Sequence, residues 1–210
     1  MNLDSWMHLR GVDPNRDFAF ITVATDGFKI GRDHVMAVSV ATNTKGPCNT
    51  VYIRGACPSQ VEEYTGLAPS YYNERAVGID RAIDTLGKLL GDRKVLVSYT
   101  VQRFTRPWFI HLFDALDLGK VWLDAVNLLK IKDVNETIPH ELETIEDLAS
   151  RLQIVAEIKK QGYAIDALLK QFSLDGWLLS LMEEGVCANK LESRCWALLA
   201  LFNDFSAMDM

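Results

Sequence analysis

Three short stretches rich in β-branched and aromatic residues lie close together near the start of the chain and restrict the folds that it can adopt. They span residues 18–25 (FAFITVAT), 34–42 (HVMAVSVAT) and 49–54 (NTVYIR). Stretches of this composition are typical of β-strands, and turn residues separate them, with Asp26 and Gly27 directly after the first. The spacing predicts three consecutive strands joined as an antiparallel meander.

From residue 78 on, the period of the apolar residues changes. Helical spacing of three and four residues alternates there with short apolar runs. This order predicts an α/β fold: a mixed sheet in which parallel strands join the three-stranded antiparallel meander, covered by helices. In chain order the pattern predicts a helix over 78–90, a strand over 95–99, a helix over 107–116, a strand over 121–123 and helices over 145–152, 164–183 and 189–205.

The length, cysteine content and net charge of the chain limit the kinds of protein that it can be. The chain has 210 residues, four cysteines and a net charge of −6. A chain of this length buries a core without disulfides, so we expect reduced thiols. No secretory signal is readable in its first residues, so we expect no leader, and its longest apolar run, 195–202, is far short of the roughly 20 residues that span a bilayer. We therefore expect a cytoplasmic protein with no membrane partner. The negative charge disfavours binding that rests on phosphate contacts alone, although a local groove can still be basic.

The order of the expected elements and four short motifs resemble the DEDD-type 3′–5′ exonucleases. This ribonuclease H-like family contains the proofreading subunit of the bacterial replicative polymerase, and the resemblance covers about residues 17–182. It implies a ribonuclease H-like mixed sheet. Residues 20–28 (FITVATDGF) resemble D-x-E-T-T-G-L, residues 96–109 (LVSYTVQRFTRPWF) resemble L-V-A-H-N-x-x-F-D-x-x-F-L, residues 122–129 resemble D-T-L-x-L and residues 144–154 resemble L-x-x-L-x-x-x-L-G-I.

The chemistry of this family needs four carboxylates around two divalent metal ions about 3.5–4 Å apart. In the first motif, Thr22 stands at the Asp position and Ala24 at the Glu position. In the second motif, an alignment without a gap puts Phe104 at the Asp position, and one with an extra residue puts Thr105 there. The resemblance therefore implies a site in which these metal ligands are missing.

The third motif, H-x-A-x-x-D-A, fits two registers. The preferred register uses Asp175 and puts Lys170 at the His position, and apolar residues follow it as in the family's last helix. The other uses Asp166 and puts Gln161 at the His position. In either register the general base and at least three of the four metal ligands are absent. The resemblance thus implies the fold and argues against the activity.

We therefore expect a catalytically degenerate exonuclease-like protein with a binding or scaffold role and no cofactor. The candidate contacts to single-stranded nucleic acid are Asp26, Tyr99, Thr100, Arg103 and Arg106. Arg103 and Arg106 could form a basic rim for phosphates together with Arg93 and Lys94, and the simpler alternative is a solvated loop. The simpler alternative for Asp26 is a turn residue. For Tyr99, Thr100 and Thr105 it is an ordinary strand end and helix start.

The functional alternative is an active exonuclease with a rearranged site. It would hold Mg²⁺ or Mn²⁺ with Asp26, Asp124 and Asp175. A protein partner is the other alternative to nucleic acid.

The last 27 residues, 184–210, predict a helical extension of the main domain, 1–183. Residues 191–205 are apolar on nearly every side of a helix. Such a helix is usually buried in its own domain, and the alternative is a homodimer or partner surface.

Overall fold

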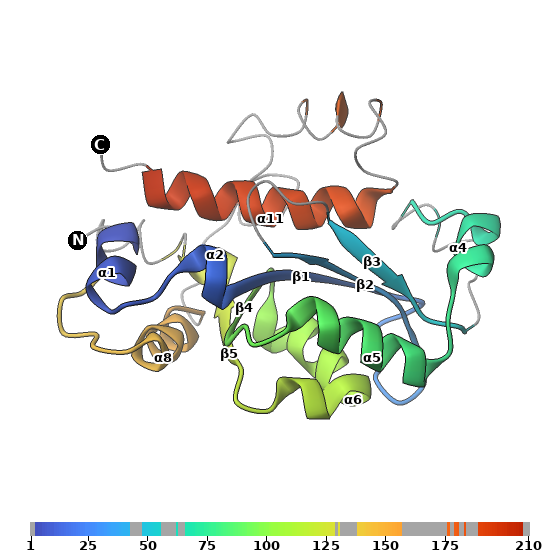
Figure 1. The fold of residues 1–210 in the computed structure, drawn as a ribbon, viewed down its shortest axis with the longest axis horizontal. Helices are drawn as coiled ribbons and strands as arrows, with labels where there is room; N and C mark the ends of the chain where they lie inside the picture. The colour runs from blue at the N-terminus through green and yellow to red at the C-terminus, as the bar shows by residue number, and fades with distance from the viewer. Residues whose placement is uncertain are drawn as a thin grey trace.

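The computed structural model describes residues 3–42, 48–55, 62, 66–128, 130, 138–156, 176, 179–180, 183 and 189–207. A five-stranded sheet in the order β3-β2-β1-β4-β5 forms its centre (Figure 1). The pairs β1–β2 and β2–β3 are antiparallel, whereas β1–β4 and β4–β5 are parallel, which confirms the predicted fold class. The strands are β1 (Phe18–Thr25), β2 (Val35–Ala41), β3 (Asn49–Tyr52), β4 (Val95–Ser98) and β5 (Val121–Asp124).

Helices cover both faces of the sheet. Figure 1 shows α11 (Lys190–Ala207) across one face and α5 (Ile79–Leu90) and α6 (Arg106–Asp117) on the other. Helix α8 (Ile145–Ala156) packs against β5. The remaining helices are short: α1 (Leu3–Leu9), α2 (Pro14–Asp17), α4 (Pro69–Arg75) and the π-helix η1 (Val101–Thr105), none of which the sequence pattern predicted. Within the described part of the chain, no helix is long and apolar enough to cross a bilayer.

The alternation of side chains along β1 decides which residues face α11. Successive residues of a strand point to opposite faces. Ile21 belongs to the hydrophobic cluster on the α5 and α6 face, whereas Phe18 and Phe20 belong to the cluster on the α11 face. Thr22 and Ala24 continue the even-numbered series and therefore face α11.

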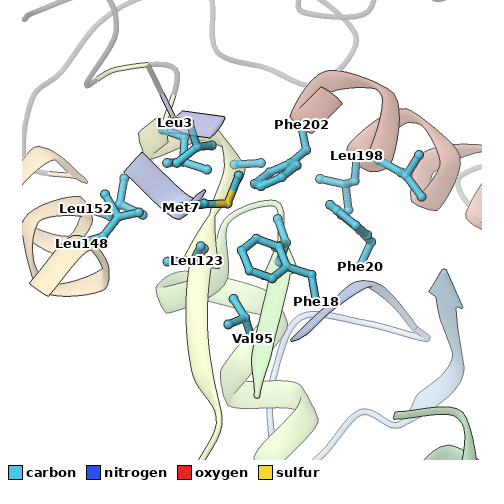
Figure 2. Packing of buried hydrophobic residues seen from close by; sticks show 14 of the residues in the cluster. Leu3, Met7, Phe18, Phe20, Val95, Leu123, Leu148, Leu152, Leu198 and Phe202 are labelled. Atoms are coloured by element: carbon cyan, nitrogen blue, oxygen red, sulfur yellow. The ribbon is translucent and has the colours of Figure 1, made fainter. Parts of the chain in front are cut away.

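The cluster on the α11 face joins both ends of the chain (Figure 2). The ring of Phe202 on α11 lies 5.2 Å from that of Phe18 and 5.4 Å from that of Phe20, both edge-on. Met7 of α1 and Leu152 of α8 belong to the same cluster. The apolar side of α11 is thus buried against its own sheet. The boundary after residue 183 and a homodimer through this helix stay predictions.

Candidate functional site

The parallel strands β1, β4 and β5 end at the same edge of the sheet, and the segments that follow them meet there. The loop 26–34 follows β1, Tyr99, Thr100 and η1 follow β4, and a helical turn over 125–128 follows β5. In open α/β sheets, ligands bind outside the carboxyl ends of the strands. A ligand site is therefore expected at this edge.

The two family positions on β1 are covered by α11. Thr22 is 8% exposed and Ala24 is 3% exposed. The hydroxyl of Thr22 donates to the backbone oxygen of Leu191 at 3.3 Å, in the first turn of α11. One turn further along, Sγ of Cys195 lies 3.3 Å from the backbone oxygen of Phe20. The start of α11 thus rests directly on β1 at these positions.

Asn189 fixes the start of α11. Its Oδ1 accepts hydrogen bonds from the backbone N–H groups of Leu191 at 2.9 Å and Glu192 at 3.0 Å, as an N-cap does. Its Nδ2 donates to the Tyr52 hydroxyl on β3 at 2.7 Å. Burial, and to a lesser extent the charge of Glu192, raise the pKa of Tyr52, so its hydroxyl stays protonated and neutral. The helix start is therefore both capped and tied to the sheet.

The second-motif residue Thr105 is buried, and its hydroxyl is used within the fold. Its Oγ1 lies 2.9 Å from the Tyr99 backbone oxygen and 3.0 Å from Oγ of Ser98. Ser98 in turn donates to the backbone oxygen of Ile21 at 2.7 Å. Thr105 thus joins the end of β4 to η1, as the ordinary strand-end alternative describes.

Asp26 closes the loop between β1 and β2. Its backbone N–H donates to the His34 backbone oxygen at 3.0 Å, and its carboxylate lies 3.1 Å from Nδ1 of His34 and accepts from the His34 backbone N–H. These contacts are those of a turn residue.

An exposed aromatic ring and an exposed cation both lie at this edge. Phe28, at the tip of the loop, is 86% exposed, and its ring centroid lies 6.3 Å from that of Phe104 in η1. The ring centroid of Phe104 lies 6.2 Å from that of Trp108, which is buried. Arg103 precedes Phe104 and is exposed, and no ion pair or hydrogen bond links its side chain to another described residue.

The other basic residues do not form one rim with Arg103. Nη2 of Arg106 lies 3.1 Å from Oδ2 of Asp117, so its charge is paired within α6. Arg93 and Lys94 precede β4 and lie at the opposite end of that strand from Arg103. The idea of a four-residue basic rim is wrong, because a strand separates its two halves.

Asp124 is a structural residue that the sequence pattern suggested only as a metal ligand. Its buried carboxylate accepts from the backbone N–H groups of Val101 at 2.7 Å and Val126 at 2.9 Å, with that of Asn127 at 3.4 Å. Burial raises the pKa of Asp124, and these hydrogen bonds oppose that rise. Thr100, just before Val101, has a left-handed backbone with φ 51°. Asp124 thus holds the strained start of η1.

Beside Asp124 lies a hollow of about 300 Å³. Thr100 and Arg103 line it from the β4 side and Asn127 and Lys130 from the β5 side. Among the residues that the structure describes, no group of three or more His, Cys, Asp or Glu side chains is arranged to hold a metal ion. Lys170 and Asp175, like Gln161 and Asp166, lie outside the described residues.

Comparison with known proteins relates the chain to others by fold alone. No protein-family model and no curated protein matches it. It is similar to Escherichia coli exonuclease I in complex with a 5cy-dT13 oligonucleotide, with a TM-score of 0.55 and 11% identity over 91% of this chain and 40% of that chain. A complex with a 5cy-dA13 oligonucleotide gives a TM-score of 0.54 and 12% identity over 91% and 41%. The chain spans about two fifths of exonuclease I. It thus has an exonuclease-like, ribonuclease H-like fold.

Proposed function

We propose that this chain is an exonuclease-like domain that binds single-stranded nucleic acid without cleaving it. The observation that carries the proposal is the burial of Thr22 and Ala24 beneath α11. Mg²⁺ and Mn²⁺ take oxygen ligands, chiefly carboxylates. A methyl group and a neutral hydroxyl that already donates to Leu191 do not replace two carboxylates.

The geometry of η1 supports the alignment of the second motif with one extra residue. The N–H of Arg106 bonds to the backbone oxygen of Val101, five residues earlier. A π turn holds one more residue than an α turn. The extra residue puts Phe104 at the family's Phe position and Thr105 at its Asp position.

The chemistry at the strand ends supports binding of an unpaired strand. Proteins that bind single strands combine aromatic rings, on which bases stack, with cations that contact the backbone. Phe28 and Phe104 supply the rings, and Arg103, which directly precedes Phe104 in η1, supplies a cation. The exonuclease I structures of similar fold hold oligonucleotides.

The rearranged-exonuclease alternative fits the contacts less well. Asp26 is bonded to His34, and Asp124 accepts from three backbone N–H groups. Both carboxylates therefore have structural partners already. A homodimer through α11 is also less favoured, because its buried apolar residues, among them Leu198 and Phe202, pack within the chain.

The test is fluorescence anisotropy with a labelled single-stranded dT oligonucleotide and a duplex of the same length. We expect the single strand to bind more tightly. Phe28→Ala should weaken binding by about 1–3 kcal/mol, the loss of one stacked base, and Arg103→Gln should reduce the salt dependence. Arg81→Gln, the same charge change on an exposed residue of α5, serves as the control. Equal affinity of parent and Phe28→Ala would refute the proposed surface.

A further inference from the structure

The outer edge of β3 is paired along only part of its length. In an antiparallel pair, every second residue exchanges hydrogen bonds with the partner strand. The N–H of Ile53 donates to the Met36 oxygen of β2 at 2.7 Å, and the register between the two strands is constant along β3. Thr50 and Tyr52 therefore turn their backbone N–H and C=O groups away from β2, toward the free edge of the sheet.

Val77 already occupies one half of this edge. Its N–H donates to the Tyr52 oxygen at 2.9 Å, and its oxygen accepts from the Arg54 N–H at 2.8 Å, as in a parallel neighbouring strand. The other half is open, because no hydrogen bond joins the N–H of Tyr52, or the N–H and C=O of Thr50, to another backbone group that the structure describes. Edge groups of this kind are a template for pairing with another chain.

A hollow of about 360 Å³ lies along the open half of the edge. Residues of β3, α4, α5 and α11 line it, and both Thr50 and Tyr52 are among them. Its volume is at the lower end of the range for small-molecule sites, so it holds only a short segment. It shares no lining residue with the strand-end surface of Phe28, Phe104 and Arg103.

The charges around this hollow favour an acidic partner. Arg75 and Arg81 contribute two positive charges and Glu192 one negative charge. Both arginines are exposed. The guanidinium of Arg75 lies 3.8 Å from the centre of the Tyr71 ring and pairs with exposed Glu74 at 3.3 Å. No ion pair or hydrogen bond links the side chain of Arg81 to another described residue. A local positive charge thus lies beside the open backbone of a chain whose net charge is −6.

We propose that the open half of the β3 edge binds a short, extended, acidic segment of a partner protein by strand addition. The backbone of the segment pairs with Thr50 and with the N–H of Tyr52, and its acidic side chains contact Arg75 and Arg81. In strand addition, main-chain hydrogen bonds supply affinity and side-chain contacts supply specificity. A second copy of this chain fits less well, because a twofold contact sets the same arginines against each other. The inference goes beyond the proposed function, since it concerns a different partner on a different surface.

Fluorescence anisotropy of the full chain with a labelled peptide tests the proposal. The probe is the hexapeptide VEVEVE with acetylated and amidated ends, and the matched control is VKVKVK. We expect saturable binding of VEVEVE, at least about tenfold tighter than that of VKVKVK, because every charge changes sign. Hydrogen exchange at the amides of Thr50 and Tyr52 should slow when VEVEVE binds.

Two variants of Thr50 isolate the backbone contact. Thr50→Pro removes the N–H that faces the edge, at a position where an edge strand tolerates proline. Thr50→Val keeps this N–H, and both variants lose the contact between the Thr50 and Ser39 hydroxyls at 2.6 Å. We expect Thr50→Pro to bind VEVEVE about tenfold more weakly than Thr50→Val, the effect of one hydrogen bond. Urea unfolding checks that both variants fold.

Arg81→Gln tests the charge contact at an exposed position, where no loss of the fold is expected. It should weaken VEVEVE binding about threefold, as the loss of an exposed ion pair does. Arg103→Gln should leave VEVEVE binding unchanged, because Arg103 does not line this hollow. The two substitutions thus have opposite effects on peptide and oligonucleotide binding.

The outcomes separate this inference from the proposed function. No saturable binding of VEVEVE, equal binding of VEVEVE and VKVKVK, or equal affinity of the two Thr50 variants would overturn the inference. Unchanged binding in Arg81→Gln would overturn it too. A dimer in sedimentation that Thr50→Pro dissociates would assign the edge to a second copy and likewise overturn it. Peptide binding of the expected kind, without oligonucleotide binding, would support this inference and refute the proposed strand-end surface.

Discussion

Replacing Thr22 with Asp returns a family carboxylate to β1, and we expect it to destabilise the fold. Thr22 is buried and donates to the Leu191 backbone oxygen at 3.3 Å. An ionised carboxylate has no proton to donate, so its oxygen would face that carbonyl oxygen. Glu192, also buried in the first turn of α11, would add a like charge.

Two opposing effects set the size of the loss. An unpaired buried charge costs about 3–5 kcal/mol. The amino end of α11 offsets at most about 2 kcal/mol of this, and the N–H groups of Leu191 and Glu192 already donate to Asn189. We therefore expect a net loss of about 2–4 kcal/mol at neutral pH. Thr22→Val removes only one hydrogen bond and should cost about 1 kcal/mol.

The pH dependence identifies the cause. Burial raises the pKa of the introduced carboxyl above its unfolded value of about 3.9. The folded state then keeps the proton to higher pH, so the loss is small below pH of about 4 and grows as the pH rises through the folded value. Urea unfolding at pH 5 and pH 7.5, followed by tryptophan fluorescence, measures this. Equal stability of Thr22→Asp and Thr22→Val at pH 7.5, or stabilisation of Thr22→Asp by Mn²⁺, would refute the burial of this position.

Further predictions concern α11 and the loop after β1. Asn189→Ala removes the cap of α11 and should cost about 1–2 kcal/mol in urea unfolding, with faster hydrogen exchange at Leu191 and Glu192. Phe202→Ala should cost about 3–5 kcal/mol, whereas Ile154→Ala on the exposed side of α8 should stay within about 1 kcal/mol of the parent. Arg32 and the backbone N–H of Lys29 lower the pKa of Asp33 to about 2, so its stabilising effect is present above the ordinary value and is lost as the pH falls through about 2. Carboxyl NMR titration should show this value, and Arg32→Ala should raise it.

The strands of the sheet could be predicted from the sequence because their signals are local. The first predicted strand, 18–25, has the bounds of β1, and the fourth, 95–99, differs from β4 by one residue. The third is shorter than predicted. β3 ends at Tyr52, and Ile53, whose backbone N–H still donates to the Met36 oxygen of β2 at 2.7 Å, forms an isolated bridge with Val77. Apolar runs and turn residues carry this information along the chain.

The site could be predicted only in part, because its contacts join distant segments. Thr22 and Leu191 are 169 residues apart, and Asn189 and Tyr52 are 137 apart. No local pattern shows that the start of α11 covers the β1 positions. The prediction of a basic rim was wrong for a related reason. Lys94 and Arg103 are close in sequence, but β4 runs between them and places them at opposite ends of the strand.

The most direct test of the central claim is a combined binding and cleavage assay. A 5′-labelled single-stranded oligonucleotide is incubated with the full chain and Mn²⁺, with and without a chelator. We expect saturable binding, weakened in Phe28→Ala, with the oligonucleotide intact at high protein concentration. A ladder of 3′-shortened products that the chelator abolishes would contradict the account and favour the rearranged metal site.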